Sequence, residues 1–155
     1  MIVVSHNNSA TTTTRLLLVD NEYDNISVLS MGLEDEGFEV DAFTDPLLAL
    51  SNFKSNYYSL VILDINMPKM NGYELYKEIR KLDNKVKVCF LTASELHNES
   101  LRNPTKEILN EVKCFIPKPL TIEDLIRNVN KELHKILNEG HAEYRSEDQS
   151  DLQNY

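Results

Sequence analysis

The sequence predicts an α/β fold with a doubly wound, five-stranded parallel sheet. Short aliphatic runs alternate with amphipathic helical patterns along most of the chain, and this alternation is typical of parallel strands joined by right-handed crossover helices. Two of the runs, at 15–20 (RLLLVD) and 60–64 (LVILD), are apolar almost throughout, as in strands buried on both faces. Both end on aspartate, and folds of this class build their sites at the carboxyl ends of the strands.

The first part of the chain predicts a strand, a helix, an edge strand and a short helix. After the strand at 15–20, apolar residues recur at helical spacing until Gly37, which is placed to end that helix. The stretch 38–43 (FEVDAF) alternates apolar and polar residues, which fits a strand at the edge of the sheet. Thr44-Asp45-Pro46 is a helix start, and the pattern continues to Phe53.

The central strand at 60–64 is followed by a loop and a well-marked helix start. Asn71 can cap this helix while Glu74 bonds back to it, and Met70 and Leu75 are spaced to form a hydrophobic staple around the capping box. The loop that follows the central strand is therefore expected to be fixed at both of its ends.

The last part of the chain predicts two strands and two helices. A strand at 86–94 (VKVCFLTAS) precedes a weaker helical pattern that begins at or after Pro104, since proline breaks a helix interior. A short strand at 113–119 (KCFIPKP) leads into the last helix, which is capped at Thr121 and ends at Asn138. This helix has the cleanest amphipathic pattern in the chain.

Length and composition indicate one acidic domain. The chain has 155 residues, 16 basic and 25 acidic side chains and a net charge of −9, which does not favour a nucleic-acid-binding or anionic-membrane surface. No apolar run approaches the roughly 18 residues that cross a bilayer, so a cytoplasmic protein is expected. Cys89 and Cys114 lie in the last two predicted strands and are interpreted as small core residues.

Three regions are expected. Residues 1–14, rich in Ser, Thr and Asn, form a disordered leader, and residues 15–138 form the folded domain. Residues 139–155 form an acidic, disordered tail, which has five acids and one base and so carries −4 of the net charge. The tail is expected to add solubility or steering.

Polar side chains gather where the carboxyl ends of the parallel strands meet. Asp20 and Asn21 follow the first strand, Asp64 ends the central strand, and Thr92 and Lys118 lie at the ends of the last two. Two carboxylates brought together repel, and Mg²⁺ suits one or two carboxylates with a phosphoryl group and a carbonyl oxygen. Beside such an ion, Asp64 can act as a nucleophile that forms an aspartyl phosphate.

These residues resemble the receiver domain of two-component response regulators. The resemblance covers roughly residues 15–138 and rests on Asp20-Asn21-Glu22, Asp64, Met67-Pro68, Asn71-Gly72, Thr92-Ala93, Phe115 and Lys118-Pro119. It implies a flavodoxin-like fold with the strand order 2-1-3-4-5. It also implies no enzyme activity beyond Mg²⁺-dependent self-phosphorylation from a phosphodonor and slow self-dephosphorylation.

The resemblance assigns a role to each site residue. Asp64 is the phosphoacceptor, Thr92 and Lys118 contact the phosphoryl group, and Thr92 and Phe115 form the switch. The Mg²⁺ ligands are Asp20, Asn21, Asp64 and the backbone carbonyl of Asn66. The implied phosphoryl donor is a phosphohistidine on a sensor histidine kinase or a phosphotransfer protein.

Two residues depart from the usual pattern of that family. The family usually has an acid where this chain has Asn21, so metal affinity is expected to be lower. The sequence leaves open whether Asn21 ligates the metal or only caps the following helix, and Glu22 is either a ligand or a solvated acid of the first turn. The switch aromatic is often tyrosine, and Phe115 lacks its hydroxyl group.

Two other functions remain open. The alternatives are a phosphorylation-independent interaction module and an aspartyl-phosphate phosphatase, which is disfavoured because Asn66 stands where those hydrolases have a second acid.

A phosphorylated receiver is expected to bind a downstream partner protein through the face formed by the last two helices and the last strand. Lys106, Ile108 and Lys113 are the candidate contacts there.

Overall fold

A computed structural model describes residues 13–93 and 104–148, with side chains to Glu139. Five parallel strands form one sheet in the order β2-β1-β3-β4-β5, which confirms the predicted fold class and strand order. The strands are β1 (Arg15–Val19), β2 (Glu39–Phe43), β3 (Leu60–Asp64), β4 (Lys87–Thr92) and β5 (Cys114–Pro117). The helices are α1 (Tyr23–Asp35), α2 (Pro46–Asn52), α3 (Gly72–Leu82), α5 (Lys106–Glu111) and α6 (Ile122–Asp148).

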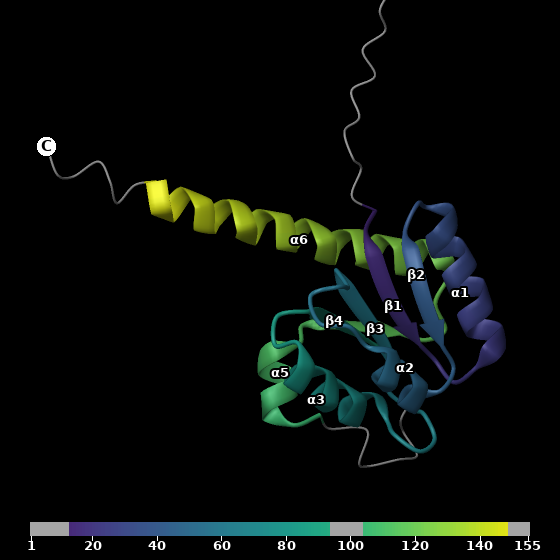
Figure 1. Ribbon diagram of the computed structural model, residues 1–155. Coiled ribbons are helices and arrows are strands. Elements are labelled where there is room, and N and C mark those ends of the chain that lie inside the picture. The colour runs from purple at the N-terminus through teal and green to yellow at the C-terminus, as the bar shows by residue number, and fades with distance from the viewer. Residues whose placement is uncertain (1–12, 94–103, 149–155) are drawn as a thin grey trace, which may run out of the picture.

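Helices cover both faces of the sheet, and the alternation of strand side chains divides the core in two (Figure 1). Leu17 and Leu63 point to the face covered by α2, α3 and α5, whereas Leu16 and Ile62 point to the face covered by α1 and α6. The central strand β3 is buried along its whole length. The doubly wound arrangement therefore leaves the ends of the strands as the places where polar side chains can gather.

The predicted helix starts are present. Asn71 accepts a hydrogen bond from the Glu74 amide at 2.9 Å, and the Glu74 carboxylate accepts one from the Asn71 amide at 2.9 Å, which completes the capping box of α3. Helix α5 begins after Pro104, as expected, with Thr105 as its cap. Ile108 of this helix is only 1% exposed, so the prediction that it contacts a partner is wrong: its side chain fills the core.

Helix α6 differs from the prediction in length. It continues to Asp148, ten residues beyond the expected end at Asn138, and projects past the body of the domain (Figure 1). The prediction of an unstructured chain directly after Asn138 is therefore wrong for 139–148. This segment contains no proline and several good helix formers, and a helix can continue without an apolar face to bury. Residues 1–12 of the predicted leader (1–14) and residues 149–155 of the predicted tail (139–155) lie outside the described residues.

The two cysteines differ from the prediction in their chemistry. Both are buried as expected, but they form a disulfide between the neighbouring strands β4 and β5. Cys89 and Cys114 are register partners with a Cα–Cα distance of 4.6 Å. Their interpretation as unbonded core residues is therefore wrong, because the register that places them opposite each other depends on the fold and cannot be read from their separation in the sequence.

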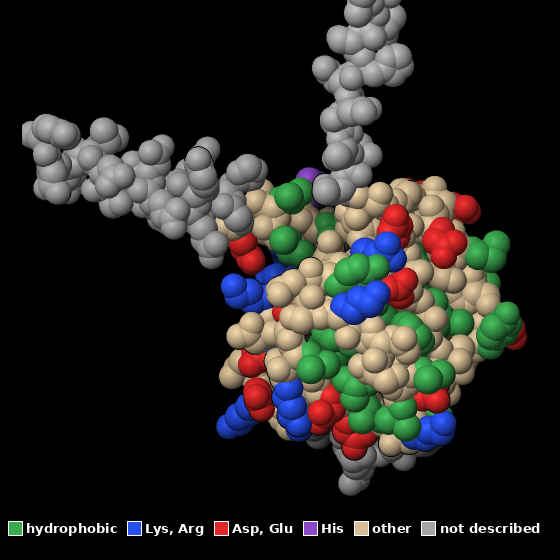
Figure 2. Space-filling model, viewed as in Figure 1, with side chains coloured by type: hydrophobic (Ala, Val, Ile, Leu, Met, Phe, Trp, Pro, Cys, Tyr) green, Lys and Arg blue, Asp and Glu red, His purple; other side chains and the backbone are tan. Residues whose placement is uncertain are grey.

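The visible surface mixes charges and apolar groups. In Figure 2, basic and acidic side chains are interspersed over the body, and hydrophobic side chains protrude at the right edge, where α1 lies in Figure 1. On α1, Val28 is 62% and Met31 63% exposed. No helix within residues 13–93 and 104–148 is long and apolar enough to cross a membrane.

Candidate functional site

The carboxyl edge of the sheet brings together three charged side chains that are far apart in the sequence. Asp20 follows β1, Asp64 ends β3 and Lys118 follows β5. The Lys118 ammonium nitrogen, Nζ, lies 2.7 Å from Oδ2 of Asp20 and 3.5 Å from Oδ2 of Asp64. The structure thus assembles the acidic pair and the lysine that the sequence predicted at this edge.

The buried group of Asp20, Asp64 and Lys118 has two acids but only one cation. Asp20 is fully buried, Asp64 is 2% exposed and the Lys118 side chain is 12% exposed. Burial, and then the neighbouring Asp20 carboxylate, raise the pKa of Asp64 to about 7, although Lys118 acts in the opposite direction. Burial works against the charge of Lys118, but its hydrogen bond to Asp20 and the charge of Asp64 give a net rise in its pKa. In this group, two acids therefore share one cation.

The raised pKa of Asp64 predicts a pH dependence in the metal-free protein. Because the folded chain holds this proton up to about pH 7 while the unfolded chain releases it near its ordinary value of about 4, the contribution of Asp64 to stability falls as pH rises between those values. We expect a carboxyl ¹³C NMR titration in EDTA to give a midpoint near 7 for Asp64. Saturating Mg²⁺ should move that midpoint down, and a midpoint near 4 in EDTA would contradict the assignment.

Asn21 and Asn66 border Asp64. In the amide orientation that satisfies its neighbours, Nδ2 of Asn21 lies 3.2 Å from Oδ2 of Asp64 and 3.2 Å from the backbone oxygen of Asn66. The N-cap position of α1 belongs to Glu22, so the interpretation of Asn21 as the helix cap is wrong. The Glu22 carboxylate accepts a hydrogen bond from Asn25 at 2.8 Å and lies on the exposed side of the helix start.

The donor set around Asp64 fits Mg²⁺. Oδ1 of Asp64 is buried and has no hydrogen-bond partner among the described residues, so this oxygen is free to take one. Within residues 13–93 and 104–148 no three His, Cys, Asp or Glu side chains are grouped as a metal site. The oxygens at hand are the carboxylates of Asp20 and Asp64, the Asn21 amide and the Asn66 carbonyl, and a hard cation that keeps several waters suits such a set.

The loop after β3 is held against the site by backbone contacts. The Ile65 amide donates to the Leu91 carbonyl at 3.2 Å, and the Gly72 amide donates to the Ile65 carbonyl at 2.8 Å. A Cβ added to Gly72 would lie 2.4 Å from the backbone oxygen of Asp64, closer than any real contact. Sequence reasoning missed this role, although a glycine directly after the capping Asn71 marks a position where the backbone approaches closely.

Thr92 and Phe115 lie on one face of the sheet. Thr92 ends β4 two residues after Phe90, so both side chains face α3 and α5, and Phe115 is the register partner of Phe90 on β5. The ring centroids of Phe90 and Phe115 are 5.5 Å apart. The Lys118 amide donates to the Thr92 carbonyl at 2.6 Å, which ties the ends of the two strands together.

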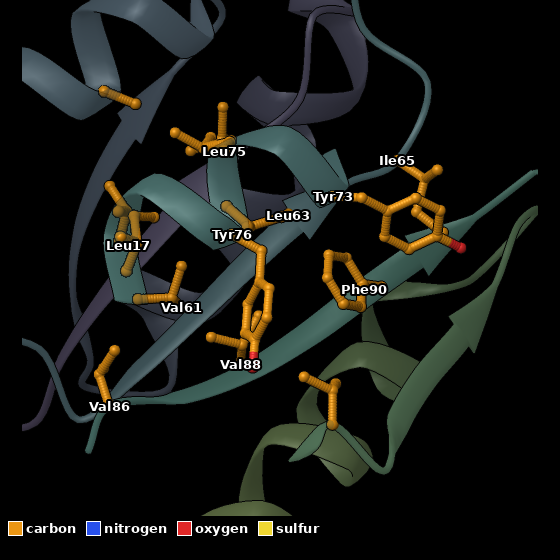
Figure 3. Packing of buried hydrophobic residues seen from close by; sticks show 14 of the residues in the cluster. Leu17, Val61, Leu63, Ile65, Tyr73, Leu75, Tyr76, Val86, Val88 and Phe90 are labelled. Atoms are coloured by element: carbon orange, nitrogen blue, oxygen red, sulfur yellow. The ribbon is translucent and has the colours of Figure 1, made fainter. Parts of the chain in front are cut away.

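The packing around Phe115 contains residues that the sequence did not single out. Figure 3 shows Tyr73 and Tyr76 of α3 on either side of Phe90, with ring-centroid distances of 5.1 and 5.7 Å. The Tyr76 hydroxyl donates to Glu111 at the end of α5, and Nε of Arg80 donates to the same hydroxyl at 3.0 Å. Helix α5 is thereby linked to α3 and, through Phe90, to Phe115. Aromatic residues at helical spacing are a weak signal for such a link.

Comparisons with known proteins agree with this geometry. The sequence matches the family described as the response regulator receiver domain over residues 16–130. It is 39% identical over 121 residues to the transcriptional regulatory protein CpxR homolog of Haemophilus influenzae, covering 78% of this chain and 51% of that protein. It is 31% identical over 121 residues to the sensor protein EvgS of Escherichia coli, covering 78% of this chain and 10% of that protein.

A solved structure shows the same fold. The crystal structure of a response regulator receiver domain protein (CheY-like) from Methanospirillum hungatei superposes with a TM-score of 0.68 at 26% identity, covering 83% of this chain and 99% of the other. The chain spans about half the length of the CpxR homolog.

Proposed function

This chain belongs to the response regulator receiver domain family, and on that premise we propose that it is a phosphorylation switch in which Asp64 accepts a phosphoryl group from a sensor histidine kinase or a phosphotransfer protein. Receiver domains belong to two-component signalling, which in general implies a histidine kinase as partner. The observation that best supports the proposal is the buried Oδ1 of Asp64, which has no partner among the described residues, while Oδ2 of the same carboxylate lies 3.5 Å from Lys118.

The chemistry follows from the charges at the site. The Asp64 carboxylate attacks the phosphorus of a phosphohistidine, the phosphorus–nitrogen bond breaks, and the imidazole leaves with the electron pair and takes up a proton. The product is an aspartyl phosphate. Asp20, Asn21, Asp64 and the Asn66 carbonyl would hold Mg²⁺, which would supply positive charge at the phosphoryl oxygens. Lys118, which contacts Asp20 at 2.7 Å, exchanges part of this contact for a contact with the new anion.

The switch uses Thr92 and Phe115. The phosphoryl group adds about −1.5 to −2 charges and accepts hydrogen bonds from the Thr92 hydroxyl and Lys118, each worth roughly 1.5 to 3 kcal/mol. The sum is of the order of the ~5.5 kcal/mol that moves a two-state element from 1:99 to 99:1. Movement of Thr92 towards the phosphoryl group leaves space on the face that it shares with Phe115, and the ring can turn into it.

We expect Thr92→Ala to accept phosphate but to transmit it poorly, because the variant keeps Asp64 and Lys118 and loses the hydroxyl that responds to the phosphoryl group. The measurement is the ¹⁹F NMR shift of a fluorinated Phe115 with and without acetyl phosphate, at matched phosphorylation by intact mass. Thr92→Ser retains the hydroxyl and is the control that should preserve the shift. A full response of Phe115 in Thr92→Ala would refute the coupling.

Output is proposed to pass through a partner protein that binds the face formed by α5, β5 and α6. Lys106 and Lys113 are exposed there, and Glu111 connects α5 to Tyr76 and Arg80 of α3. Because Phe115 lies on β5 and packs against Phe90, a change in its position reaches this face first.

The proposal is tested by incubating the protein with acetyl phosphate and Mg²⁺ and measuring intact mass. One added phosphoryl group that depends on Mg²⁺ supports it. An unmodified mass under conditions that label another receiver would favour the phosphorylation-independent interaction module. Rapid turnover of phosphorylated substrates without a stable adduct would favour the phosphatase.

A further inference from the structure

Asn21 lies next to two hydrogen-bond acceptors, so only a side chain that donates hydrogen bonds can satisfy them. Its two neighbours, Oδ2 of Asp64 and the backbone oxygen of Asn66, are both acceptors, and in the amide orientation that satisfies them each lies 3.2 Å from Nδ2 of Asn21. An NH₂ group has two hydrogens and can donate to both at once. An aspartate at this position would place a third carboxylate beside Asp20 and Asp64 and could satisfy neither neighbour.

We propose that the Asn21 amide is a positioning residue that stands in for the metal ion in the metal-free protein. It holds the Asp64 carboxylate and the Asn66 carbonyl together by donating one hydrogen bond to each, so that the site stays assembled before Mg²⁺ arrives. The proposal deepens the proposed function, on which it rests only for the identity of the ion.

The charge balance explains why this donor matters. Lys118 makes its short contact with Asp20, at 2.7 Å, and lies 3.5 Å from Asp64. The Asn21 amide is nearer to Oδ2 of Asp64, at 3.2 Å, than the lysine is. A neutral donor stabilises the carboxylate while adding no negative charge to a group that already has two acids and one cation.

Metal binding then requires the amide to turn. A cation needs an oxygen from Asn21, whereas the metal-free arrangement presents its nitrogen, so the two hydrogen bonds must break as the side chain rotates to offer Oδ1. Asn21 therefore lowers Mg²⁺ affinity in two ways: it supplies no charge, and its hydrogen bonds compete with the ion. In exchange, the metal-free site is held in place.

The test observes the Asn21 side-chain amide directly by ¹⁵N NMR of the full chain, with the signal assigned by its loss in Asn21→Leu. In EDTA we expect both protons to exchange slowly with water, and Mg²⁺ should shift the pair and speed its exchange. The Asn128 amide, which donates to the Asp124 carbonyl at 2.8 Å on α6, is the internal control and should not respond. Rapid exchange in EDTA, or no response to Mg²⁺, would overturn the proposal.

Two variants separate the donor from the charge. Asn21→Leu is neutral and cannot donate, so its Tm in EDTA should fall, and Mg²⁺ should restore little of it. Asn21→Asp has nearly the same shape but only acceptors, so its Tm in EDTA should also fall, while its Mg²⁺ affinity rises roughly tenfold. An unchanged Tm for Asn21→Leu in EDTA would show that the amide does not stabilise the metal-free site.

The outcome is independent of phosphorylation. Slow amide exchange in EDTA with no labelling by acetyl phosphate would leave the positioning role intact and refute the proposed function. Labelling of a protein whose Asn21 amide exchanges freely would leave the proposed function intact and refute the positioning role of Asn21.

Discussion

Asp64→Asn is expected to abolish phosphoryl incorporation from acetyl phosphate and Mg²⁺ while leaving the fold intact. An amide has the shape of the carboxylate but is not a nucleophile, and the other buried acid beside Lys118, Asp20, is already held by that lysine at 2.7 Å. Because the raised pKa of Asp64 shows that its charge is costly when buried, the metal-free variant should also unfold at a higher temperature than the wild type at pH 8. Intact mass and thermal unfolding measure the two effects.

Asp45→Asn is the matched control. Asp45 also follows a strand at the carboxyl edge, where it caps α2 by accepting a hydrogen bond from the Leu47 amide at 2.9 Å, and asparagine caps a helix equally well. This variant should be labelled as the wild type is. Stoichiometric labelling of Asp64→Asn would place the phosphoacceptor elsewhere and remove the main support for the proposed function.

Gly72→Ala is expected to destabilise the protein by about 3 kcal/mol and to slow phosphorylation. The new methyl group would meet the Asp64 carbonyl at 2.4 Å and the Ile65 Cα at 2.9 Å, and both are backbone atoms that cannot rotate away. Either α3 or the end of β3 must move, and the second shift displaces the nucleophile. Urea unfolding gives the first effect, and the rate of labelling by acetyl phosphate gives the second.

Gly37→Ala separates this contact from a general effect of replacing glycine. Gly37 ends α1 with φ at +94° and has open space around a Cβ, so alanine there meets only the backbone penalty of about 1 to 2 kcal/mol. Its labelling rate should equal that of the wild type. If Gly72→Ala is labelled at the wild-type rate, the close approach of α3 does not position Asp64.

The sequence predicted the parts of the site that depend only on the parallel direction of the strands and on where the helices begin. Parallel strands put Asp20, Asp64 and Lys118 at one edge whatever their exact spacing, and the capping box at Asn71 fixes where α3 begins.

The parts that the sequence could not give depend on register and on side-chain orientation. The disulfide between Cys89 and Cys114 needs the β4–β5 register, and the contact of Gly72 with the Asp64 carbonyl needs the approach angle of α3. The direction of the Asn21 amide depends on two acceptors, one of them a backbone oxygen that no sequence pattern marks. The end of α6 was missed because a polar helix has no apolar residues recurring at helical spacing that would mark it in the sequence.

Helix α6 is long enough for a small rotation at its base to move its far end by a large distance. Its 27 residues span about 40 Å, and its last described contact with the body is the ion pair between Lys87 and Glu139, at 3.1 Å. A rotation of about 10° at the base of the helix would carry its far end through roughly 7 Å, whereas the residues packed on the sheet would move far less. A small rotation of α6 at its base would therefore produce a displacement at Asp148 large enough for a distance probe to record.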